Sequence, residues 1–411
     1  MSNLIIDKIN KSTNADFADV QTDIQEFKNK MKGQALFIRA LTYFMMTRVW
    51  GDVPMVVESY PDPLKAPQLP RTPAAEVQKQ IEKDCKEAAV LLNWGYKDKT
   101  ERAVIANRGS VYALLAHLYL WRATMSNLNS NTPNPADVNN ADTTVTKLLA
   151  QGGYNYTDTT NYYMTFIGRN NTTTSPEGIF QLYMDDRTQE GSANHIGLEF
   201  LHGDDYVYQS GNSGRFWVPS TYFNYNYKYW FDHPVDGWIQ VTDTNDIRYR
   251  KNFDYTNSSE PMCRKYSNVI YRNPGQQRDP YLSNDLIIFR YSDMKLLQAE
   301  IALYKNDLNT AIQIINDSRD RNGANPYSTN RVDNTYSRDE LMKEYIIERG
   351  KELYVEGHIF YDLLRTRMYT EFVDWLSEGR FKRGGFYWPV SPLLFKENRF
   401  LVQTSYWLGQ I

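Results

Sequence analysis

The chain has 411 residues and a formal net charge of −3, with 41% hydrophobic and 23% charged residues. It carries no basic block or stripe, so it lacks the electrostatic pattern of a nucleic-acid-binding protein. No segment reaches the roughly 18 consecutive apolar residues that a membrane-spanning helix needs. The length exceeds that of one ordinary compact core and predicts either two domains or one large layered helical domain.

The first predicted helices cover residues 4–10 and 16–50. In the second helix apolar residues recur at helical spacing in two rows, which leaves little polar face, and we expect it to be buried on several sides. Gly51 suits a left-handed C-cap, and Pro54 prevents the helix from continuing. The rows are Ala35, Ile38, Leu41, Met45 and Val49, and Phe37, Phe44 and Trp50.

Two more helices follow, "RTPAAEVQKQIEKDCKEAAVLLN" with Thr72 as N-cap and Pro73 as first helical residue, and "NRGSVYALLAHLYLWRAT". Residues 286–304 and 309–321 predict a helix hairpin of about the length of a tetratricopeptide unit. The last strong helix begins at a capping box of Ser337 and Glu340, and Gly357 ends its first segment.

Between these helical parts the sequence becomes rich in Asn, Thr, Gly, Asp and Tyr, and "EGIFQLYM" is the best strand. Long loops in a compact protein are usually functional, so we look for a site here. We divide the chain into an N-terminal helical part at 1–123, a loop-rich insert at 124–285 that carries the ligand site, and a C-terminal helical part at 286–411.

Aromatic residues make up 14% of the chain, with 31 tyrosines and 9 tryptophans, and ten of the 24 residues from Arg215 to Trp238 are aromatic. Flat rings interleaved with polar groups are typical of wet recognition surfaces, and a sugar offers a C–H face for a ring and hydroxyls for polar groups. The alternative is that Phe223, Tyr227, Trp230 and Phe231, at helical spacing, pack a short helix onto the scaffold. Our candidate glycan-binding residues are Trp217, Trp238, Tyr206, Tyr208, Tyr222, Tyr227, Trp230, Arg215, Asp232 and Asn226.

Charged residues on apolar helices are interpreted as structural pairs rather than an active site: Arg39, Arg290, Glu348, Arg349, Glu352, Glu356 and Asp362. His358 beside Asp362 would suit a general base, but no nucleophile accompanies it. Asp185–Asp186 and Asp204–Asp205 would suit a glycosidase pair, although adjacent carboxylates in such loops are more often solvated or bind calcium loosely.

We expect no metal or cofactor. The five histidines are scattered, and the two cysteines, Cys85 and Cys263, have no metal-binding spacing. A disulfide between these cysteines is permitted but not required. Because Cys85 falls inside a helical pattern, we interpret it as a buried thiol.

Six segments in order resemble motifs of the SusD-like (RagB/SusD) nutrient-binding family. "KGQALFIRALTYFMMTRVWGDVPMV" resembles the family's L-R-A-x-x-Y-F and F-G-D-V-P signature, and "IIERGKELYVEGHIFYDLLRT" resembles E-R-x-x-E-L-x-x-E-G. Two departures are His358–Ile359, where Gly-His-Arg is commoner, and "QTSYW" in place of Q-N-P-G-Y. The matching segments are residues 32–56, 71–92, 107–123, 286–323, 346–366 and 388–407.

The resemblance implies a mainly α fold, an α-helical scaffold with tetratricopeptide-like helix pairs and a loop-rich ligand face with a few short strands. It also implies a non-catalytic protein on the external face of a Bacteroidetes outer membrane that binds oligosaccharides and delivers them to a TonB-dependent, SusC-like transporter. Two alternatives stay open, a peptide-binding lid of the RagB type and a glycoside hydrolase.

Family members normally carry a leader ahead of this start, with a signal peptide and a lipid-accepting cysteine. The N-terminus shows no signal peptide, and neither Cys85 nor Cys263 can be the lipid-accepting residue. We therefore expect membrane association through a lipid anchor that is absent from this chain.

Overall fold

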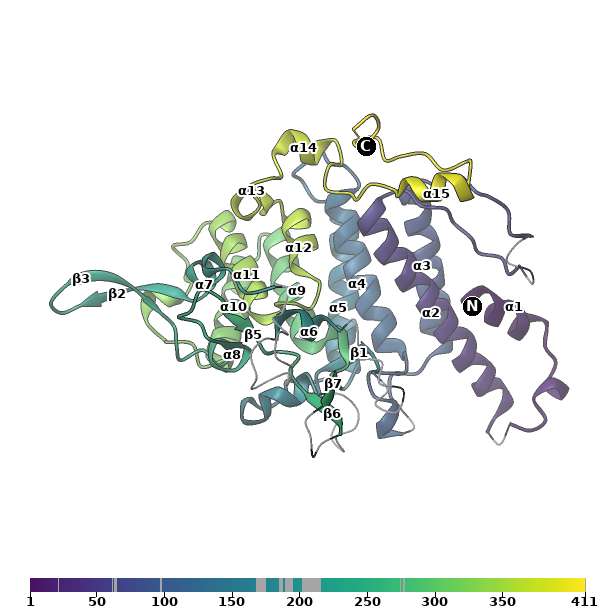
Figure 1. Ribbon diagram of the computed structural model, residues 1–411, viewed down its shortest axis with the longest axis horizontal. Coiled ribbons are helices and arrows are strands. Elements are labelled where there is room, and N and C mark those ends of the chain that lie inside the picture. Colours follow the sequence, from purple (N-terminus) through teal and green to yellow (C-terminus); the bar gives the residue numbers. More distant parts are fainter. Residues whose placement is uncertain are drawn as a thin grey trace. The chain divides into compact units, whose positions relative to one another are not determined.

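The computed structural model describes residues 1–411 except 21, 61, 63–64, 97, 168–174, 185–187, 189–194, 202–215, 274, 276–277 and 411. The chain divides into two compact units. Unit 1 comprises Met1–Tyr96, Ile105–Gly153 and Leu363–Ile411, and unit 2 comprises Lys97–Val104 and Tyr154–Asp362. Helices predominate in both units and the strands are short (Figure 1), which confirms the mainly α fold class.

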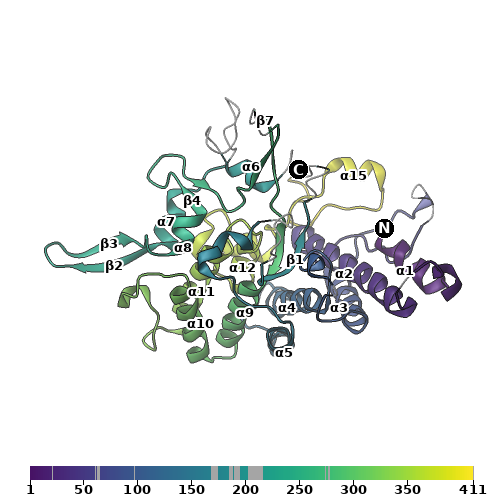
Figure 2. The ribbon, with the colours of Figure 1, turned by 90° about the horizontal axis from the view of Figure 1, so that it is seen from below.

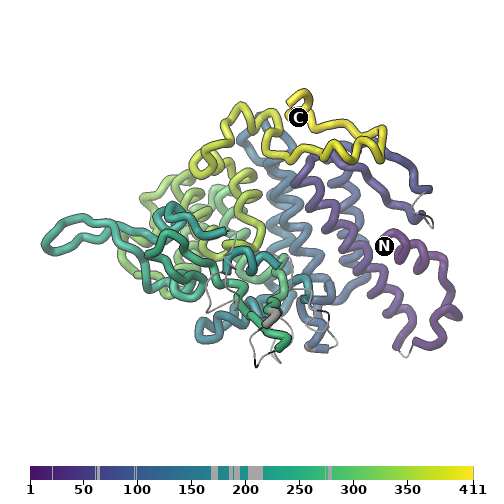
Figure 3. The backbone as a smooth tube through the Cα atoms, viewed as in Figure 1, coloured from purple at the N-terminus to yellow at the C-terminus, as the bar shows by residue number. Residues whose placement is uncertain are grey.

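In unit 1 the first five α-helices form a stack in which each helix packs against the next one along the chain. Figure 3 follows the chain through this stack. The central helix, α4, is the most buried, and Leu114, Leu118 and Leu120 on it are fully enclosed. The elements are α1 (Ser2–Lys11), η1 (Asn14–Phe17), α2 (Ile24–Trp50), α3 (Ala74–Leu91), α4 (Arg108–Met125), α5 (Pro135–Gln151), α13 (Tyr369–Phe372), α14 (Glu378–Lys382) and α15 (Pro392–Glu397), with α12 (Ile359–Thr366) crossing the unit boundary.

The helix ends of unit 1 follow the sequence signals with two corrections. Gly51 has a φ of 72° and its N–H caps α2, as its position predicted. The predicted helix 16–50 was too long, because the chain forms the short η1 first and α2 begins only at Ile24. The predicted N-cap Thr72 was also wrong: Thr72 forms a β-bridge with Val53, and Pro73 caps α3 instead.

The side chains of α2 are less uniformly buried than the two apolar rows predicted. Leu36, Phe37, Ala40 and Phe44 are enclosed, but Ile38 is exposed. Ile38 therefore faces solvent although it belongs to an apolar row.

Within its described residues, unit 2 combines three long helices with four two-stranded antiparallel sheets, β1–β8, β2–β3, β4–β5 and β6–β7. The predicted strand within "EGIFQLYM" is confirmed as β1. The elements are η3 (Lys99–Glu101), η4 (Thr159–Thr165), β1 (Gly178–Leu182), α6 (Ile196–Phe200), α7 (Ser220–Asn226), β2 (Lys228–His233), β3 (Gly237–Thr242), α8 (Ile247–Asn252), β4 (Phe253–Asp254), β5 (Met262–Cys263), β6 (Val269–Asn273), β7 (Arg278–Leu282), β8 (Leu286–Arg290), α9 (Tyr291–Tyr304), α10 (Leu308–Arg321), η6 (Ser328–Asn330) and α11 (Arg338–Glu352).

The predicted helix at 286–304 is wrong for its first five residues, which form β8 and pair with β1. Alternation explains the difference, because Ile287 and Phe289 are buried while Leu286 and Ile288 are only partly buried. The rest of the predicted hairpin is confirmed as α9 and α10, which pack against each other and against α11. The capping box of Ser337 and Glu340 opens α11 as expected.

The two units cut across the three predicted segments, because Tyr154–Asp362 forms one unit. The three-part division of the sequence stays a prediction. Among the described helices none is both long and apolar enough to cross a membrane.

Candidate functional site

The most distinctive surface of unit 2 is the β2–β3 hairpin, which extends away from α7, α8 and α10 (Figures 1 and 2). Its strands pair in continuous antiparallel register from Lys228 opposite Thr242 to His233 opposite Gly237. Gly237 has a φ of 70°, which a glycine adopts without strain, and it closes the turn. Because side chains alternate along each strand, this register divides the hairpin into two faces.

The inner face holds the hairpin onto unit 2. The Tyr229 side chain is buried, and the ring centroid of Phe231 lies 5.1 Å from that of Tyr327. The Tyr327 ring also lies 6.2 Å from the Tyr229 ring. Beside it, the Thr329 hydroxyl donates to the carbonyl oxygen of Trp230. These contacts fix the base of the hairpin against the segment that includes η6.

The outer face presents two tryptophans to solvent. Trp230 is 52% exposed and Trp238 is 57% exposed. Trp230 lies opposite Gln240, and Trp238 lies opposite Asp232, so the two rings are diagonal neighbours. Diagonal side chains in an antiparallel pair are about 7–8 Å apart, within reach of one extended ligand. We call this surface the tryptophan face; it consists of Lys228, Trp230, Asp232, Trp238, Gln240 and Thr242.

Trp217 lies on a separate segment, just before α7. It is 51% exposed, and the neighbouring Phe216 is 52% exposed. The ring of Phe216 packs 5.9 Å from that of Phe200. The Trp217 side chain is therefore accessible from solvent, and its role as a glycan contact stays a prediction.

Tyr222, Asn226 and Tyr227 make packing contacts within unit 2. Tyr222 donates to the carbonyl oxygen of Gly350 at 3.0 Å, and Asn226 donates to the carbonyl oxygen of Tyr222 at 2.7 Å. Tyr227 is only 1% exposed, and burial raises its pKa well above the ordinary value for tyrosine. The prediction that Tyr227 contacts the ligand was wrong, because neighbouring rings of the unit 2 core enclose its ring.

The alternative reading of this segment as one short helix is half correct. Phe223 and Tyr227 pack α7 and its C-terminal end into the core. Trp230 and Phe231 lie on β2, not on a helix, and point to opposite faces. Three further candidates, Tyr206, Tyr208 and Arg215, lie outside the described residues, as do Asp185, Asp186, Asp204 and Asp205.

The charged residues on apolar helices form buried ion pairs, as expected. Arg290 binds Glu356 at 2.8 Å, Glu352 at 2.7 Å and Glu177 at 2.9 Å. Arg248, which no sequence pattern marks as buried, binds Glu348 at 2.6 Å. In unit 1, Arg39 pairs with Asp84 at 2.7 Å. Each of these carboxylates is neutralised by a partner, so this network holds the fold and offers no free acid for catalysis.

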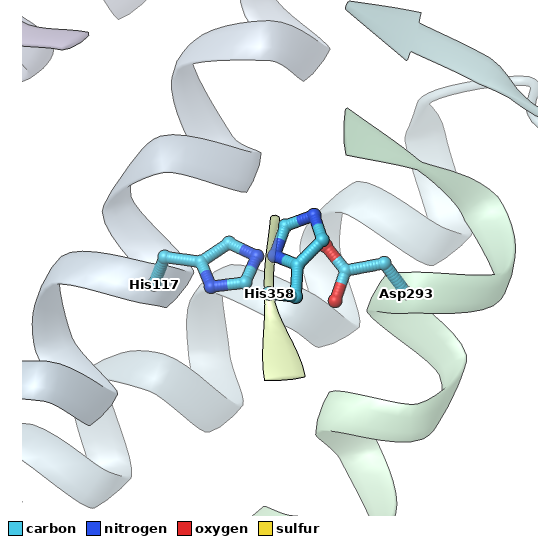
Figure 4. A group of neighbouring side chains, drawn as sticks. All are labelled: His117, Asp293 and His358. Atoms are coloured by element: carbon cyan, nitrogen blue, oxygen red, sulfur yellow. The ribbon is translucent and has the colours of Figure 1, made fainter. Parts of the chain in front are cut away.

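His358 and Asp362 each bond to other groups of unit 2. The Asp362 carboxylate accepts from Arg349 at 2.6 Å, and His358 Nε2 lies 3.1 Å from the carbonyl oxygen of Ile288. Figure 4 shows His358 next to Asp293 of α9, with a ligand atom of each within 4.8 Å of the other; the third side chain drawn, His117, belongs to unit 1. Asp293 is itself paired with Arg349 at 2.9 Å, so we assign this pair a structural role.

Both cysteines are buried free thiols, as interpreted for Cys85. Burial raises the pKa of Cys263 to about 11 and that of Cys85 well above its ordinary value. A thiol in this state is a poor nucleophile.

Family models match most of the chain. The model described as "SusD family" matches residues 148–385, and the model described as "Starch-binding associating with outer membrane" matches residues 1–120. The chain is 25% identical over 377 residues to a SusD-like protein, P38, of Formosa agariphila, covering 85% of this chain and 69% of that protein.

Solved structures share the fold. A SusD homologue of Bacteroides thetaiotaomicron matches with a TM-score of 0.71 and 22% identity, over 99% of this chain and 80% of that one. A SusD superfamily protein of the same organism matches with a TM-score of 0.74 and 21% identity, over 99% of this chain and 83% of that one.

Proposed function

The chain belongs to the SusD family, and from this premise we propose that it is a non-catalytic protein of the outer membrane's external face that binds oligosaccharides and delivers them to a TonB-dependent, SusC-like transporter. The observation that carries the binding proposal is the tryptophan face. A pyranose stacks its C–H face on an exposed ring and directs its hydroxyls to polar groups at the ring edge. Trp230 and Trp238 supply the rings, and Asp232 and Gln240 supply the polar partners.

The expected affinity suits a carrier that must release its cargo. Covering about 50 Å² of each ring at about 25 cal/mol/Å² contributes about 1.2 kcal/mol per ring. Two or three hydrogen bonds add about 1 kcal/mol each. The sum is roughly −4 to −6 kcal/mol, which corresponds to millimolar to tens-of-micromolar dissociation constants.

Hydrolysis requires two carboxylates flanking the scissile bond, about 5 to 9.5 Å apart. The tryptophan face holds a single carboxylate, Asp232, and the buried acids described above are engaged with arginines. This arrangement supports binding rather than catalysis.

The binding proposal is tested by isothermal titration calorimetry of the purified chain against malto-, xylo-, laminari- and galacto-oligosaccharides, with casein peptides as a separate arm. We expect heat of binding with at least one glycan. We also expect that chromatography detects no new reducing ends after the chain has been incubated with the glycans overnight. If no glycan gives heat of binding and the peptides do, the ligand is a peptide and not an oligosaccharide. If shortened sugars are released, the chain is a glycoside hydrolase and not a non-catalytic binding protein.

Delivery is tested separately, by co-purification of the chain with SusC-like barrels expressed from the same genome. We expect a complex that survives detergent extraction. A barrel that purifies without this chain at every salt concentration would contradict delivery while leaving glycan binding intact.

A further inference from the structure

Unit 1 contains a groove of about 570 Å³ that no part of the proposed function uses. Its floor is one face of α4, where Arg108 and Tyr112 are a helical turn apart. Its walls come from α3, which contributes Lys86, and from α5, which contributes Thr143 and Lys147. The volume lies within the 300–1,000 Å³ typical of small-molecule sites.

The groove is cationic although the chain as a whole is acidic, with a net charge of −3. Lys86, Arg108 and Lys147 line it from three different helices, and no carboxylate is among its lining residues. Lys86 is partly neutralised by Glu82 at 2.6 Å, just outside the lining. Within the part of the chain that the structure describes, Arg108 and Lys147 form no ion pair with a carboxylate.

The two unpaired cations are held in place by aromatic rings. The Arg108 guanidinium lies 5.8 Å from the centroid of Trp94, and its Nε donates to the carbonyl oxygen of Leu92 at 2.9 Å. Lys147 Nζ lies 5.3 Å from the centroid of Tyr112. The Trp94 and Tyr112 rings pack 4.9 Å apart, so both cations rest on one aromatic pair. Because Arg108 and Lys147 are already held by these rings, a ligand that binds the two cations loses less free energy in ordering their side chains.

We propose that this groove binds an acidic oligosaccharide, with a uronate carboxylate or a sulfate ester between Arg108 and Lys147 and a pyranose ring against Tyr112. Charge complementarity selects the anion, and the exposed hydroxyl of Thr143 and the amide of Asn140 on α5 offer partners for sugar hydroxyls. A guanidinium pairs with a carboxylate or sulfate through two parallel hydrogen bonds. The site lies in unit 1, so it is distinct from the tryptophan face of unit 2.

The test is calorimetry at low salt with tetragalacturonate as the carboxylate probe, a kappa-carrageenan tetrasaccharide as the sulfate probe and maltotetraose as the neutral probe. We expect one or both acidic probes to bind, and binding to weaken as salt rises from 50 to 500 mM. In the double variant Arg108→Gln/Lys147→Gln the affinity for the acidic probe should fall at least tenfold. The single variant Lys147→Gln, which alters only an exposed side chain, should lose part of that affinity without a change in melting temperature.

The matched control is Lys83→Gln, which removes one exposed positive charge from α3 outside the lining. It should leave the affinity within twofold of the wild type. Failure of both acidic probes to bind, an equal loss in the control, or binding only to anionic phosphatidylglycerol vesicles would overturn the proposal. If Trp230→Ala/Trp238→Ala loses binding of the acidic probe, the acidic sugar binds at the hairpin. That result would overturn the groove as a binding site and leave the proposed function intact.

Discussion

Replacing both tryptophans of the hairpin, in the variant Trp230→Ala/Trp238→Ala, should remove most of the stacking energy. Each side chain is more than half exposed, so one side of each ring is open to a sugar. At about 50 Å² covered per ring and about 25 cal/mol/Å², the two rings together contribute about 2.5 kcal/mol. The dissociation constant for the best glycan of the panel, measured by calorimetry, should therefore rise roughly 70-fold.

Two control variants separate stacking from damage to the fold. Trp388→Ala removes a tryptophan of unit 1 that is 64% exposed, and it should leave the affinity unchanged. Trp230→Thr/Trp238→Thr keeps residues that favour strands, so it should lose as much affinity as the alanine variant while retaining the hairpin. Wild-type affinity in both double variants, with an intact hairpin, would refute the stacking argument.

Three further predictions concern the supports of the site and of unit 2. Tyr327→Ala removes the ring that packs against Phe231, so glycan affinity should fall by about 1 kcal/mol and amide exchange in β2 and β3 should accelerate; unchanged exchange would contradict this. Burial raises the pKa of Glu348, but three neighbouring cations outweigh it and hold the value at about 2. The ionised Glu348 carboxylate therefore contributes stability that is complete above about 4.3, the pKa of glutamate in the unfolded chain, and is lost as the pH falls toward 2. Glu348→Gln should make the free energy of unfolding in urea depend less on pH between pH 5 and 2, and an unchanged pH dependence would contradict this. A Cβ on Gly197 would lie 2.3 Å from the Tyr266 carbonyl oxygen, so Gly197→Ala should lower the free energy of unfolding by about 1–3 kcal/mol, whereas Gly379→Ala, which meets nothing within 4 Å, should not.

The helices could be predicted because their signals are local. The 3.6-residue period and the Ser337–Glu340 capping box mark α11, and Gly51 marks the end of α2 with its positive φ. The errors lie where a tertiary contact outweighs a local preference. Residues 286–290 form a strand because β1 is available to pair with them, although they lead directly into a helix.

The hairpin could not be predicted from aromatic content because both of its faces carry rings. Tyr229 and Phe231 point inward only because Tyr327, distant in the sequence, packs against them. Trp230 and Trp238 were named as candidates from composition alone. Gln240 was missed, because its place opposite Trp230 follows from the register of β2 and β3, which a three-residue turn at 234–236 sets.

The buried ion pairs were predicted as a class but not as a network. Arg290, Glu352 and Glu356 stand on or near strongly periodic helices, so their burial could be anticipated. Arg248 and Glu177 lie in the loop-rich insert, where no periodicity marks a residue as buried. Only the folded chain brings them to the same carboxylates and guanidinium groups.

The central claim is that a sugar stacks on the tryptophan face, and a titration of the indole N–H signals by two-dimensional nuclear magnetic resonance tests it most directly. Single variants Trp230→Phe and Trp238→Phe assign the two signals among the nine tryptophans. We predict that these two indole signals shift together with a single dissociation constant as the best glycan is added. Shifts confined to other tryptophans, with both of these unmoved at saturation, would contradict the claim.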